Sequence, residues 1–242
     1  MWADYRKRAL FESDTVLALD KPVGVSVMGE RHESDLVRMA ADAGETLYPV
    51  HRIDKVTSGV ILFAKDLAAH GGLTRQFNKR TVEKAYLAVV TPGGLPATGR
   101  VDLPLSVGRK NRVRIAAARE RIVAGLDPDT AAGTWSVPAD AVFDQVPTYP
   151  SVTELRVPWQ DERHALVVAN PLTGRRHQIR VHLAWIGHPI LNDPLFDKAA
   201  TGRTHLHAWR LSFDLDGERV TVQAPPDEEF LAPVPDAVIP PE

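Results

Sequence analysis

The stretch that decides the fold covers residues 51–64 and reads His-Arg-Ile-Asp-Lys-Val-Thr-Ser-Gly-Val-Ile-Leu-Phe-Ala. Its first half is polar and carries both signs of charge, whereas residues 59–64 are apolar, β-branched and aromatic, which predicts a buried strand. Asp54 lies between Arg52 and Lys55, and neighbouring cations favour the ionised form of a carboxylate. Such a carboxylate suits a nucleophile or a fixed base. The alternative is a surface turn held by ion pairs.

Further strands are predicted on both sides of this stretch, from apolar runs or from alternation of apolar and polar residues. They cover residues 15–19, 82–90, 152–157, 165–169, 204–213 and 218–223. Asp216-Gly217, between the last two, is a hairpin signal. Residues 33–43 and 67–80 have helical composition. Because strands outnumber helices and hairpin turns join several of them, the predicted fold class is α+β: a mixed, largely antiparallel β-sheet with flanking helices.

The composition is that of a globular protein, with 242 residues, 44% hydrophobic and 25% charged side chains. We expect a single domain over residues 1–242. Residues 122–151 are rich in Ala, Asp and Pro with little periodicity, so they are expected to form a surface insertion. The Pro-rich tail, residues 224–242, is expected to be extended.

Several classes of protein are disfavoured by missing features. The chain has no cysteine, which excludes disulfides, thiolate metal sites and a thiol nucleophile. No apolar run approaches the ~20 residues that span a bilayer, and a cytoplasmic location without membrane attachment is expected. Neither a Gly-rich nucleotide loop nor a Gly-x-Ser-x-Gly elbow is present, which argues against kinases, ATPases, dinucleotide-dependent enzymes and serine hydrolases.

Charge is distributed unevenly along the chain, although the formal net charge is only −2. Residues 51–121 contain fourteen Lys and Arg against five acids, a balance of +9, whereas residues 214–242 contain eight acids and one Arg, a balance of −7. Such a chain can present a basic surface to a polyanion while staying nearly neutral overall. Ordinary solvated faces are the alternative.

Residues 109–121 form the most basic segment, Arg-Lys-Asn-Arg-Val-Arg-Ile-Ala-Ala-Ala-Arg-Glu-Arg. If its first half is a strand, Lys110, Arg112 and Arg114 point to one face about 6.7 Å apart. A nucleic-acid backbone can follow that spacing, so phosphate contacts are one use of the segment. The other is a solvated edge strand whose charges prevent aggregation.

A second polar cluster precedes a short predicted helix whose apolar residues follow helical spacing. These residues are Ile179, Leu183 and Ile186, and Gly187 ends the helix. Three basic residues lie near its N-terminal end: Arg176, His177 and Arg180. Because the helix dipole favours negative charge there, we expect a carboxylate or a phosphate at this end.

Nine histidines raise the alternative of a metal site, above all His177, His182, His188, His205 and His207. On a helix, however, His177 and His182 are about 140° apart around the axis. They cannot share a metal ion as ligands at i and i+4 do. No acidic partner lies at a recognisable spacing, so no metal is expected.

Taken together, the polar clusters resemble the motifs of the RluA-type RNA pseudouridine synthases. The matching segments are Leu-Asp-Lys-Pro-Val-Gly at 19–24, residues 51–60, Lys-Ala-Tyr-Leu-Ala-Val-Val at 84–90, Gly-Arg-Arg-His-Gln-Ile-Arg-Val-His at 174–182, Gly-His-Pro-Ile-Leu at 187–191 and Leu-His-Ala-Trp-Arg-Leu at 206–211. The chain departs from the family pattern at Asn192, where Gly is common, and at Phe196, where Tyr is frequent. These two departures bear on which RNA the protein takes as its substrate.

The resemblance implies isomerisation of uridine to pseudouridine in a structured ribosomal or transfer RNA, without metal or organic cofactor. Asp54 matches the aspartate that starts cleavage of the glycosidic bond, and Arg180 the arginine that pairs with it. Tyr86 matches the tyrosine that stacks on the target base. Ile179 matches an apolar residue of the base pocket, and Arg52 the arginine that enters the space left by the uridine, whose unstacking costs a few kcal/mol.

Further basic residues are expected to bind the RNA substrate: His51, Arg176, His177, Lys110, Arg112 and Arg114. Because only about fourteen residues precede the first predicted strand, we expect a single catalytic domain without the separate N-terminal RNA-binding domain of many relatives, working as a monomer. Two other hypotheses stay open. One is a non-catalytic RNA-binding module of the same fold, and the other is a metal-dependent hydrolase that uses the histidines.

Overall fold

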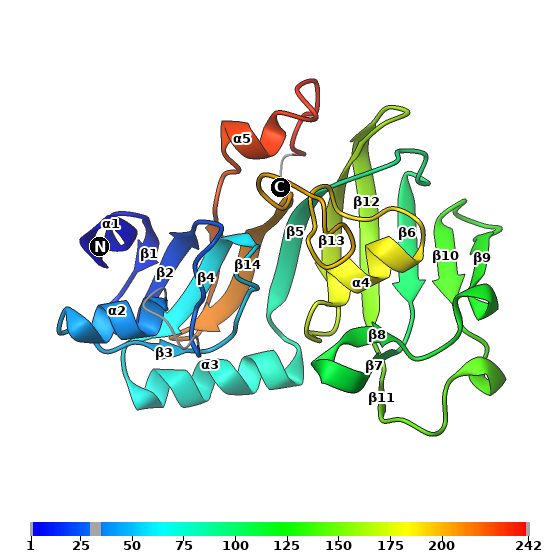
Figure 1. Ribbon diagram of the computed structural model, residues 1–242. Helices are drawn as coiled ribbons and strands as arrows, with labels where there is room; N and C mark the ends of the chain where they lie inside the picture. Colours follow the sequence, from blue (N-terminus) through cyan, green and yellow to red (C-terminus); the bar gives the residue numbers. More distant parts are fainter. Residues whose placement is uncertain (1, 30–34, 241–242) are drawn as a thin grey trace. The chain divides into compact units, whose positions relative to one another are not determined.

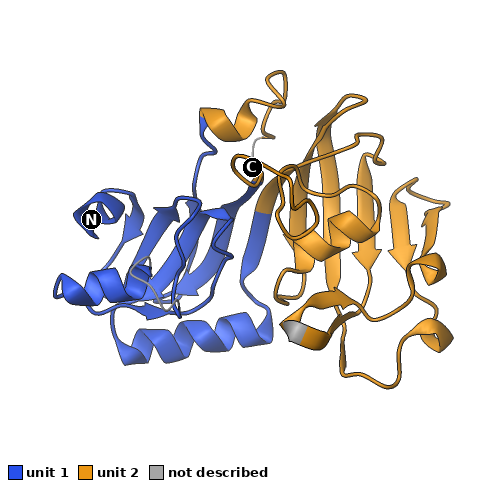
Figure 2. Cartoon of the chain, in the orientation of Figure 1, with its two compact units in different colours: residues 1–85, 206–227 blue, residues 86–205, 228–242 orange. Residues whose placement is uncertain are grey.

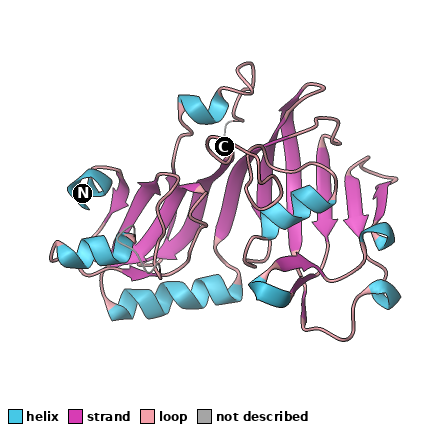
Figure 3. Ribbon diagram, in the orientation of Figure 1, coloured by secondary structure: helices cyan, strands magenta, loops and turns pink. Residues whose placement is uncertain are grey.

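The computed structural model describes residues 2–29 and 35–240. The chain divides into two compact units, Met1–Ala85 with Leu206–Asp227 and Tyr86–His205 with Glu228–Glu242 (Figure 2). Strands dominate over helices in both (Figure 3). Most strand pairs are antiparallel, so the predicted α+β class with a mixed, largely antiparallel sheet is confirmed. No helix in the described part of the chain is long and apolar enough to cross a membrane.

The first unit is built around the predicted strand of residues 59–64. Its elements are α1 (Trp2–Arg6), β1 (Ala9–Glu12), β2 (Val16–Lys21), α2 (Leu36–Asp42), β3 (Tyr48–Pro49), β4 (Ser58–Ala64), α3 (Leu67–Lys79), β14 (Leu206–Leu215) and β15 (Glu218–Gln223) (Figure 1). Every residue of β4 is buried. On one edge β4 pairs with β2, and on the other with β14 and β3.

Helix α3 covers one face of this sheet and completes its core. Leu73 of the helix is buried with Val60 and Leu62 of β4 and with Phe213 of β14. The helix begins where the Asp66 side chain accepts the backbone N–H of Ala69 at 2.8 Å, as an N-cap does. Burial of these apolar side chains stabilises the unit by about 1.5–3 kcal/mol for each large one.

The second unit contains a run of six neighbouring strands and a separate sheet of three strands. Strands β5 (Glu83–Val90), β13 (Ala165–Pro171), β12 (Val152–Gln160), β6 (Thr98–Asp102), β10 (Gly133–Ser136) and β9 (Val123–Leu126) follow one another in that order. The smaller sheet contains β11 (Thr148–Tyr149), β7 (Leu105–Val107) and β8 (Val113–Ile115). Helix α4 (Gln178–Trp185) contacts β8, β12 and β13. Short 3₁₀ turns cover Arg109–Asn111, Arg119–Arg121 and Ala139–Ala141.

The hairpin predicted at Asp216-Gly217 is confirmed. Strands β14 and β15 pair antiparallel up to Leu215 and Glu218. Both turn residues have positive φ, 52° and 87°, as the favoured two-residue hairpin turns require. The helix expected at 33–43 is α2, whose N-cap is Asp35; residues 30–34 lie outside the described part of the chain.

Two segments differ from the expectation. Residues 122–151 do not simply cover the surface, because β10 pairs in parallel with β6 and β9 pairs with β10, which extends the main sheet of the second unit. The tail does not trail off extended either: it forms α5 (Glu228–Leu231), and Phe230 and Val234 are fully buried. The high proline content of the tail gave no sign of these two apolar side chains. Their burial stabilises the packed tail relative to an extended one.

Candidate active site

Asp54 lies on a turn that leads directly into β4. The backbone N–H of Thr57 donates to the Asp54 carbonyl oxygen at 2.9 Å, which closes the turn. Asp54 is half-buried, whereas Arg52 and Lys55 on either side of it are exposed. Gly59 then enters the strand with φ of +103°, and a Cβ there would lie 2.2 Å from the carbonyl oxygen of Ala208. Only glycine fits this close approach, so Gly59 fixes where the turn ends.

A buried lysine supports the same turn from the next strand. The Lys21 ammonium, 1% exposed, donates to the carbonyl oxygens of Val25 at 2.8 Å, Pro22 at 2.9 Å and Lys55 at 3.4 Å. Burial lowers the pKa of Lys21 to about 7, and the negative charge of Asp54 acts against that shift. Lys21 therefore holds the backbone next to Asp54 and places a cation in the electrostatic range of its carboxylate. Sequence reasoning did not single Lys21 out, although it lies in the matched 19–24 segment.

His51 has a structural role at the start of the turn. Its Nε2 accepts the backbone N–H of Leu62 at 3.0 Å, on the edge of β4 between the residues paired with β14 and those paired with β3. Its ring stacks on Phe77 with centroids 4.8 Å apart. Burial, and then the charge of Lys84, lower the pKa of His51 to about 3. His51 is therefore neutral and has only its Nδ1–H left for an RNA ligand.

Tyr86 lies on β5, where it is half-buried and in register with Ala169 of β13. Lys84 precedes it by two residues on the same strand. Burial, and then the charge of Arg80, lower the pKa of Lys84 to about 8. A lysine with a pKa this close to neutrality is a signal that sequence reasoning missed, because only its burial reveals it.

Arg180 projects from α4 into the interior of the second unit. Its guanidinium donates through Nε to Oδ2 of Asp193 at 2.8 Å and through Nη2 to Oδ1 at 2.6 Å. The two side chains are 6% and 1% exposed. Asp193 is held in turn by the backbone N–H of Leu195, which donates to Oδ1 at 2.9 Å. This bidentate pair fixes the guanidinium plane, and Asp193 was not among the predicted site residues.

The loop before α4 is held by a buried glutamine. Oε1 of Gln178 accepts the Thr173 hydroxyl at 2.7 Å and the Arg175 backbone N–H at 3.1 Å. Its Nε2 donates to the Val152 carbonyl oxygen at 2.9 Å. His177, the N-cap residue, has φ of 56° in the left-handed region, which non-glycine residues seldom adopt. Strained conformations of this kind concentrate at functional sites.

The basic segment at 109–114 is not the strand that was expected. Arg109–Asn111 is a 3₁₀ turn and β8 begins only at Val113, so Arg112 precedes the strand and only Arg114 lies in it. Asn111 adopts φ of 59°, which breaks the period-two alternation. The three basic residues therefore do not form one row along a strand face. Arg112 and Arg114 are exposed, and the side chain of Lys110 lies outside the described part of the structure.

The predicted site residues belong to both units. Asp54, Arg52 and His51 lie in the first unit. The others lie in the second: Tyr86, Ile179, Arg180, Arg176, His177, Lys110, Arg112 and Arg114. Ile179 is 6% exposed and Arg176 is exposed at the surface. Within the second unit, α4 and the loop before it bring Arg176, His177, Ile179 and Arg180 together, as predicted from the sequence.

Three histidines that suggested a metal site make hydrogen bonds with the protein. His207 donates from Nε2 to the Ala224 carbonyl at 2.8 Å and accepts the Ser58 hydroxyl at Nδ1, also at 2.8 Å. His182 donates to the Leu103 carbonyl at 3.0 Å, and burial lowers its pKa to about 4. His205 donates to a carbonyl oxygen of α5 at 3.1 Å. Among the described residues, no group of three or more His, Asp or Glu side chains could hold a metal ion.

Two solved structures share this fold. Human RNA Pseudouridylate Synthase Domain Containing 4 superposes with a TM-score of 0.74 at 22% identity, covering 96% of this chain and 94% of that one. Human RNA Pseudouridylate Synthase Domain Containing 1 gives a TM-score of 0.68 at 23% identity, covering 90% of this chain and 82% of that one.

Sequence comparison gives higher identity to curated relatives. The tRNA pseudouridine synthase C of Pasteurella multocida (strain Pm70) is 32% identical, over 92% of each chain. The dual-specificity RNA pseudouridine synthase RluA of Escherichia coli (strain K12) is 34% identical, over 90% of this chain and 92% of its own. Ribosomal large subunit pseudouridine synthase C of P. multocida is 35% identical, over 93% of this chain and 66% of its own.

The family match covers most of the segments that build both polar clusters. Residues 15–185 match the family described as RNA pseudouridylate synthase. This range contains the Asp54 turn, the Tyr86 strand and Arg180 of α4. The chain therefore belongs to the RNA pseudouridylate synthase family, in its RluA-type branch, and is an isomerase.

Proposed function

We propose that the chain isomerises specific uridines of ribosomal or transfer RNA to pseudouridine, with Asp54 as the catalytic carboxylate. The relatives support this substrate class, because their names assign them to transfer RNA, to the large ribosomal subunit, or to both kinds of RNA. The chain works as a monomer in the cytoplasm, with a structured RNA as its partner and without metal or organic cofactor.

The observation that carries the proposal is the Asp54 turn. Asp54 is half-buried within the electrostatic range of the buried Lys21. Its backbone is held through Thr57 and through the Lys55 carbonyl oxygen, which accepts Lys21 Nζ at 3.4 Å and the Gly24 N–H at 2.8 Å. A fixed carboxylate repels the phosphates of a polyanion, so a carboxylate at an RNA-binding site costs binding free energy. Such a cost is expected where the carboxylate reacts.

In the reaction, the Asp54 carboxylate starts the cleavage of the bond between ribose C1′ and uracil N1. The freed uracil turns, C1′ then bonds to its carbon 5, N1 gains a proton and the hydrogen on carbon 5 leaves as a proton. Tyr86 stacks on the base and takes part in proton transfer. We assign to Arg180, which Asp193 holds, the role that the resemblance gives it, and to Ile179 the lining of the base pocket.

Basic side chains position the RNA around the target uridine. Arg52, which is exposed, fills the space that the uridine leaves in its stack, an exchange that offsets unstacking of a few kcal/mol. The remaining contacts are to the backbone, from His51, Arg176, His177, Lys110, Arg112 and Arg114. Phosphate contacts fix register and orientation without reading sequence.

Tritium release tests this proposal, because bond formation at carbon 5 expels the hydrogen there. The protein is incubated with unmodified transcripts of transfer RNA and of large-subunit ribosomal RNA, each labelled with tritium at carbon 5 of uridine. We expect release from at least one pool in amounts that match the pseudouridine found by nuclease digestion and chromatography. Binding of both RNAs without release from either would instead support a non-catalytic RNA-binding module.

A further inference from the structure

Arg175 stacks on Tyr149 in the second unit, and neither residue is among the site residues assigned above. The guanidinium carbon of Arg175 lies over the Tyr149 ring, 5.4 Å from its centroid. Tyr149 is 39% exposed and Arg175 is exposed as well. A guanidinium stacked on a ring is planar and hydrated more weakly than an ammonium, so it offers solvent a second flat face on which another planar group can stack.

The loop that carries Arg175 is fixed from the protein interior. Gln178, 3% exposed, accepts the backbone N–H of Arg175 and the hydroxyl of Thr173. The Thr173 hydroxyl oxygen also accepts the backbone N–H of Val152 at 3.1 Å. One buried amide thus ties the Arg175 loop to the first residue of β12, three positions after Tyr149.

Tyr149 is fixed by its own strand. It is in register with Leu105 of β7, and the Ser151 hydroxyl donates to its carbonyl oxygen at 2.9 Å. Leu105 is also in register with Ile115 of β8, and both are buried. Because residues in register share a face of a sheet, Tyr149 lies on the face of Leu105 and Ile115, and Arg114 on the opposite face, where it stacks on Phe143 at 5.5 Å.

The surroundings of the pair are strongly basic. Arg176, next in the chain, donates to the carbonyl oxygen of Asn111, which brings the β7–β8 turn with Arg112 to this loop. None of Arg112, Arg175 and Arg176 forms an ion pair within the described part of the chain. The segments 105–117, 141–150 and 172–177 contain six Lys or Arg against one acid, a balance of +5. A polyanion fits here better than a protein partner of mixed charge.

We propose that Tyr149 and Arg175 form a stacking platform for an unpaired base of the RNA substrate, with Arg112 and Arg176 on the adjacent phosphates. The inference rests on the proposed function and adds Tyr149, from the 122–151 segment, and Arg175 to it. Unpaired RNA bases are bound by stacking on aromatic rings and on arginine planes, and each stacked base contributes substantially to affinity. The platform therefore favours RNAs that present an unpaired base next to the phosphates bound by Arg112 and Arg176.

Paired substitutions separate stacking from charge. Tyr149→Phe keeps the ring and Tyr149→Leu removes it; Arg175→Lys keeps the charge and removes the plane. The probe is whichever unmodified transcript, transfer RNA or large-subunit ribosomal RNA, releases tritium with the wild type. We expect Tyr149→Leu and Arg175→Lys each to raise Kd roughly five- to a hundred-fold, and Tyr149→Phe to bind like the wild type. Tyr149→Leu leaves the dependence of log Kd on log salt concentration unchanged, whereas Arg112→Gln lowers that slope by about 0.7.

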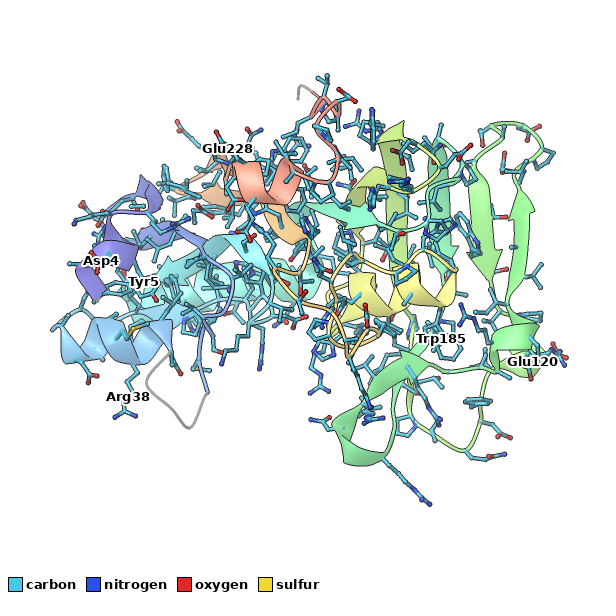
Figure 4. All side chains as sticks on the ribbon, turned by 45° about the horizontal axis from the view of Figure 1, so that its top comes forward. Asp4, Tyr5, Arg38, Glu120, Trp185 and Glu228 are labelled. Atoms are coloured by element: carbon cyan, nitrogen blue, oxygen red, sulfur yellow. The ribbon has the colours of Figure 1, made fainter. Side chains whose placement is uncertain are left out.

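Matched controls lie in the first unit, where Figure 4 labels Tyr5 and Arg38. Tyr5→Leu removes a partly exposed ring, and Arg38→Lys changes an arginine that is 61% exposed; neither changes Kd. Circular dichroism and thermal melting verify that each variant is folded. If the wild type turns over the RNA while Tyr149→Leu and Arg175→Lys bind it with wild-type Kd, the platform is refuted and the proposed function stands. No release by the wild type from either RNA would instead refute the proposed function.

Discussion

Arg180 and Asp193 form a fully buried bidentate ion pair, with both guanidinium–carboxylate distances below 2.9 Å. The pair joins α4 to the loop that follows it, thirteen residues further along the chain. Because each side chain shields the other from the apolar interior, neither can be replaced alone without leaving a buried charge. Asp193 thus determines how the guanidinium that we assign to catalysis is oriented.

Asp193→Ala is therefore expected to destabilise the protein by about 3–5 kcal/mol, the usual cost of removing one partner of a buried pair. Urea unfolding at pH 7 measures the change. Glu154→Ala is the control, because its ion pair with Arg100 is half exposed, at 51% and 48%. We expect its effect to stay within about 1 kcal/mol. Equal losses of unfolding free energy in the two variants would show that Asp193 does not stabilise the buried Arg180 guanidinium.

Gly59→Ala is expected to prevent folding or to cost several kcal/mol, since the new Cβ would overlap the Ala208 backbone at 2.2 Å. Gly44→Ala separates this clash from backbone strain. Gly44 also has positive φ, +83°, but nothing lies within 4 Å of its Cβ position. That control is expected to lose only the roughly 1–2 kcal/mol of left-handed strain. Thermal melting of both variants compares them directly.

His182 makes stability depend on pH on the acid side. Burial lowers its pKa from 6.5 to about 4, so between these values the unfolded chain binds the proton and the folded chain does not. Its contribution is fully present above pH 6.5 and is lost as pH falls toward 4, on the order of 3 kcal/mol. His182→Gln keeps a donor and an acceptor but cannot titrate. Unfolding free energies at pH 7, 5.5 and 4.5 should therefore fall less steeply in this variant.

Phe230 anchors the C-terminal segment in the second unit. Its ring is fully buried, lies 5.7 Å from the His205 ring and has the Arg203 guanidinium 5.3 Å above it. Phe230→Ala is expected to cost about 3–5 kcal/mol through the cavity it leaves. Val238→Ala in the same tail, at 74% exposure, is expected to change little. A tail that contributes nothing would give two identical melting temperatures.

Local patterns were enough to predict most of the elements. The apolar run at 59–64 became β4, and Asp216-Gly217 became the hairpin turn, because each depends on neighbours in the sequence. The strand predicted around Arg112 does not form, because Asn111 adopts a left-handed conformation. The basic residues next to Asn111 do not predict that conformation. Isolated apolar residues such as Phe230 stabilise the fold by packing against residues far away in the sequence. The polar, Pro-rich composition around them does not predict that packing.

Only those site residues that belong to sequence motifs could be predicted. The motifs singled out Asp54 and Arg180, yet the residues that hold them, Lys21 and Asp193, are identified by burial and by partners far along the chain. Likewise, His51 was expected to bind RNA, and the structure uses its ring to satisfy a backbone N–H of β4. Supporting contacts of this kind have no sequence spacing of their own, because tertiary packing creates them.

The proposed function depends most directly on Asp54, and one comparison of variants tests it. Tritium release from RNA labelled at carbon 5 of uridine is measured for the wild type, for Asp54→Asn and for Asp42→Asn, an exposed carboxylate of α2 that serves as control. We predict that Asp54→Asn binds the RNA with Kd within a few-fold of the wild type, melts at the same temperature and loses more than about 10³-fold in turnover. Asp42→Asn keeps full turnover. Wild-type turnover by a folded Asp54→Asn protein would contradict the assignment of Asp54 as the catalytic carboxylate.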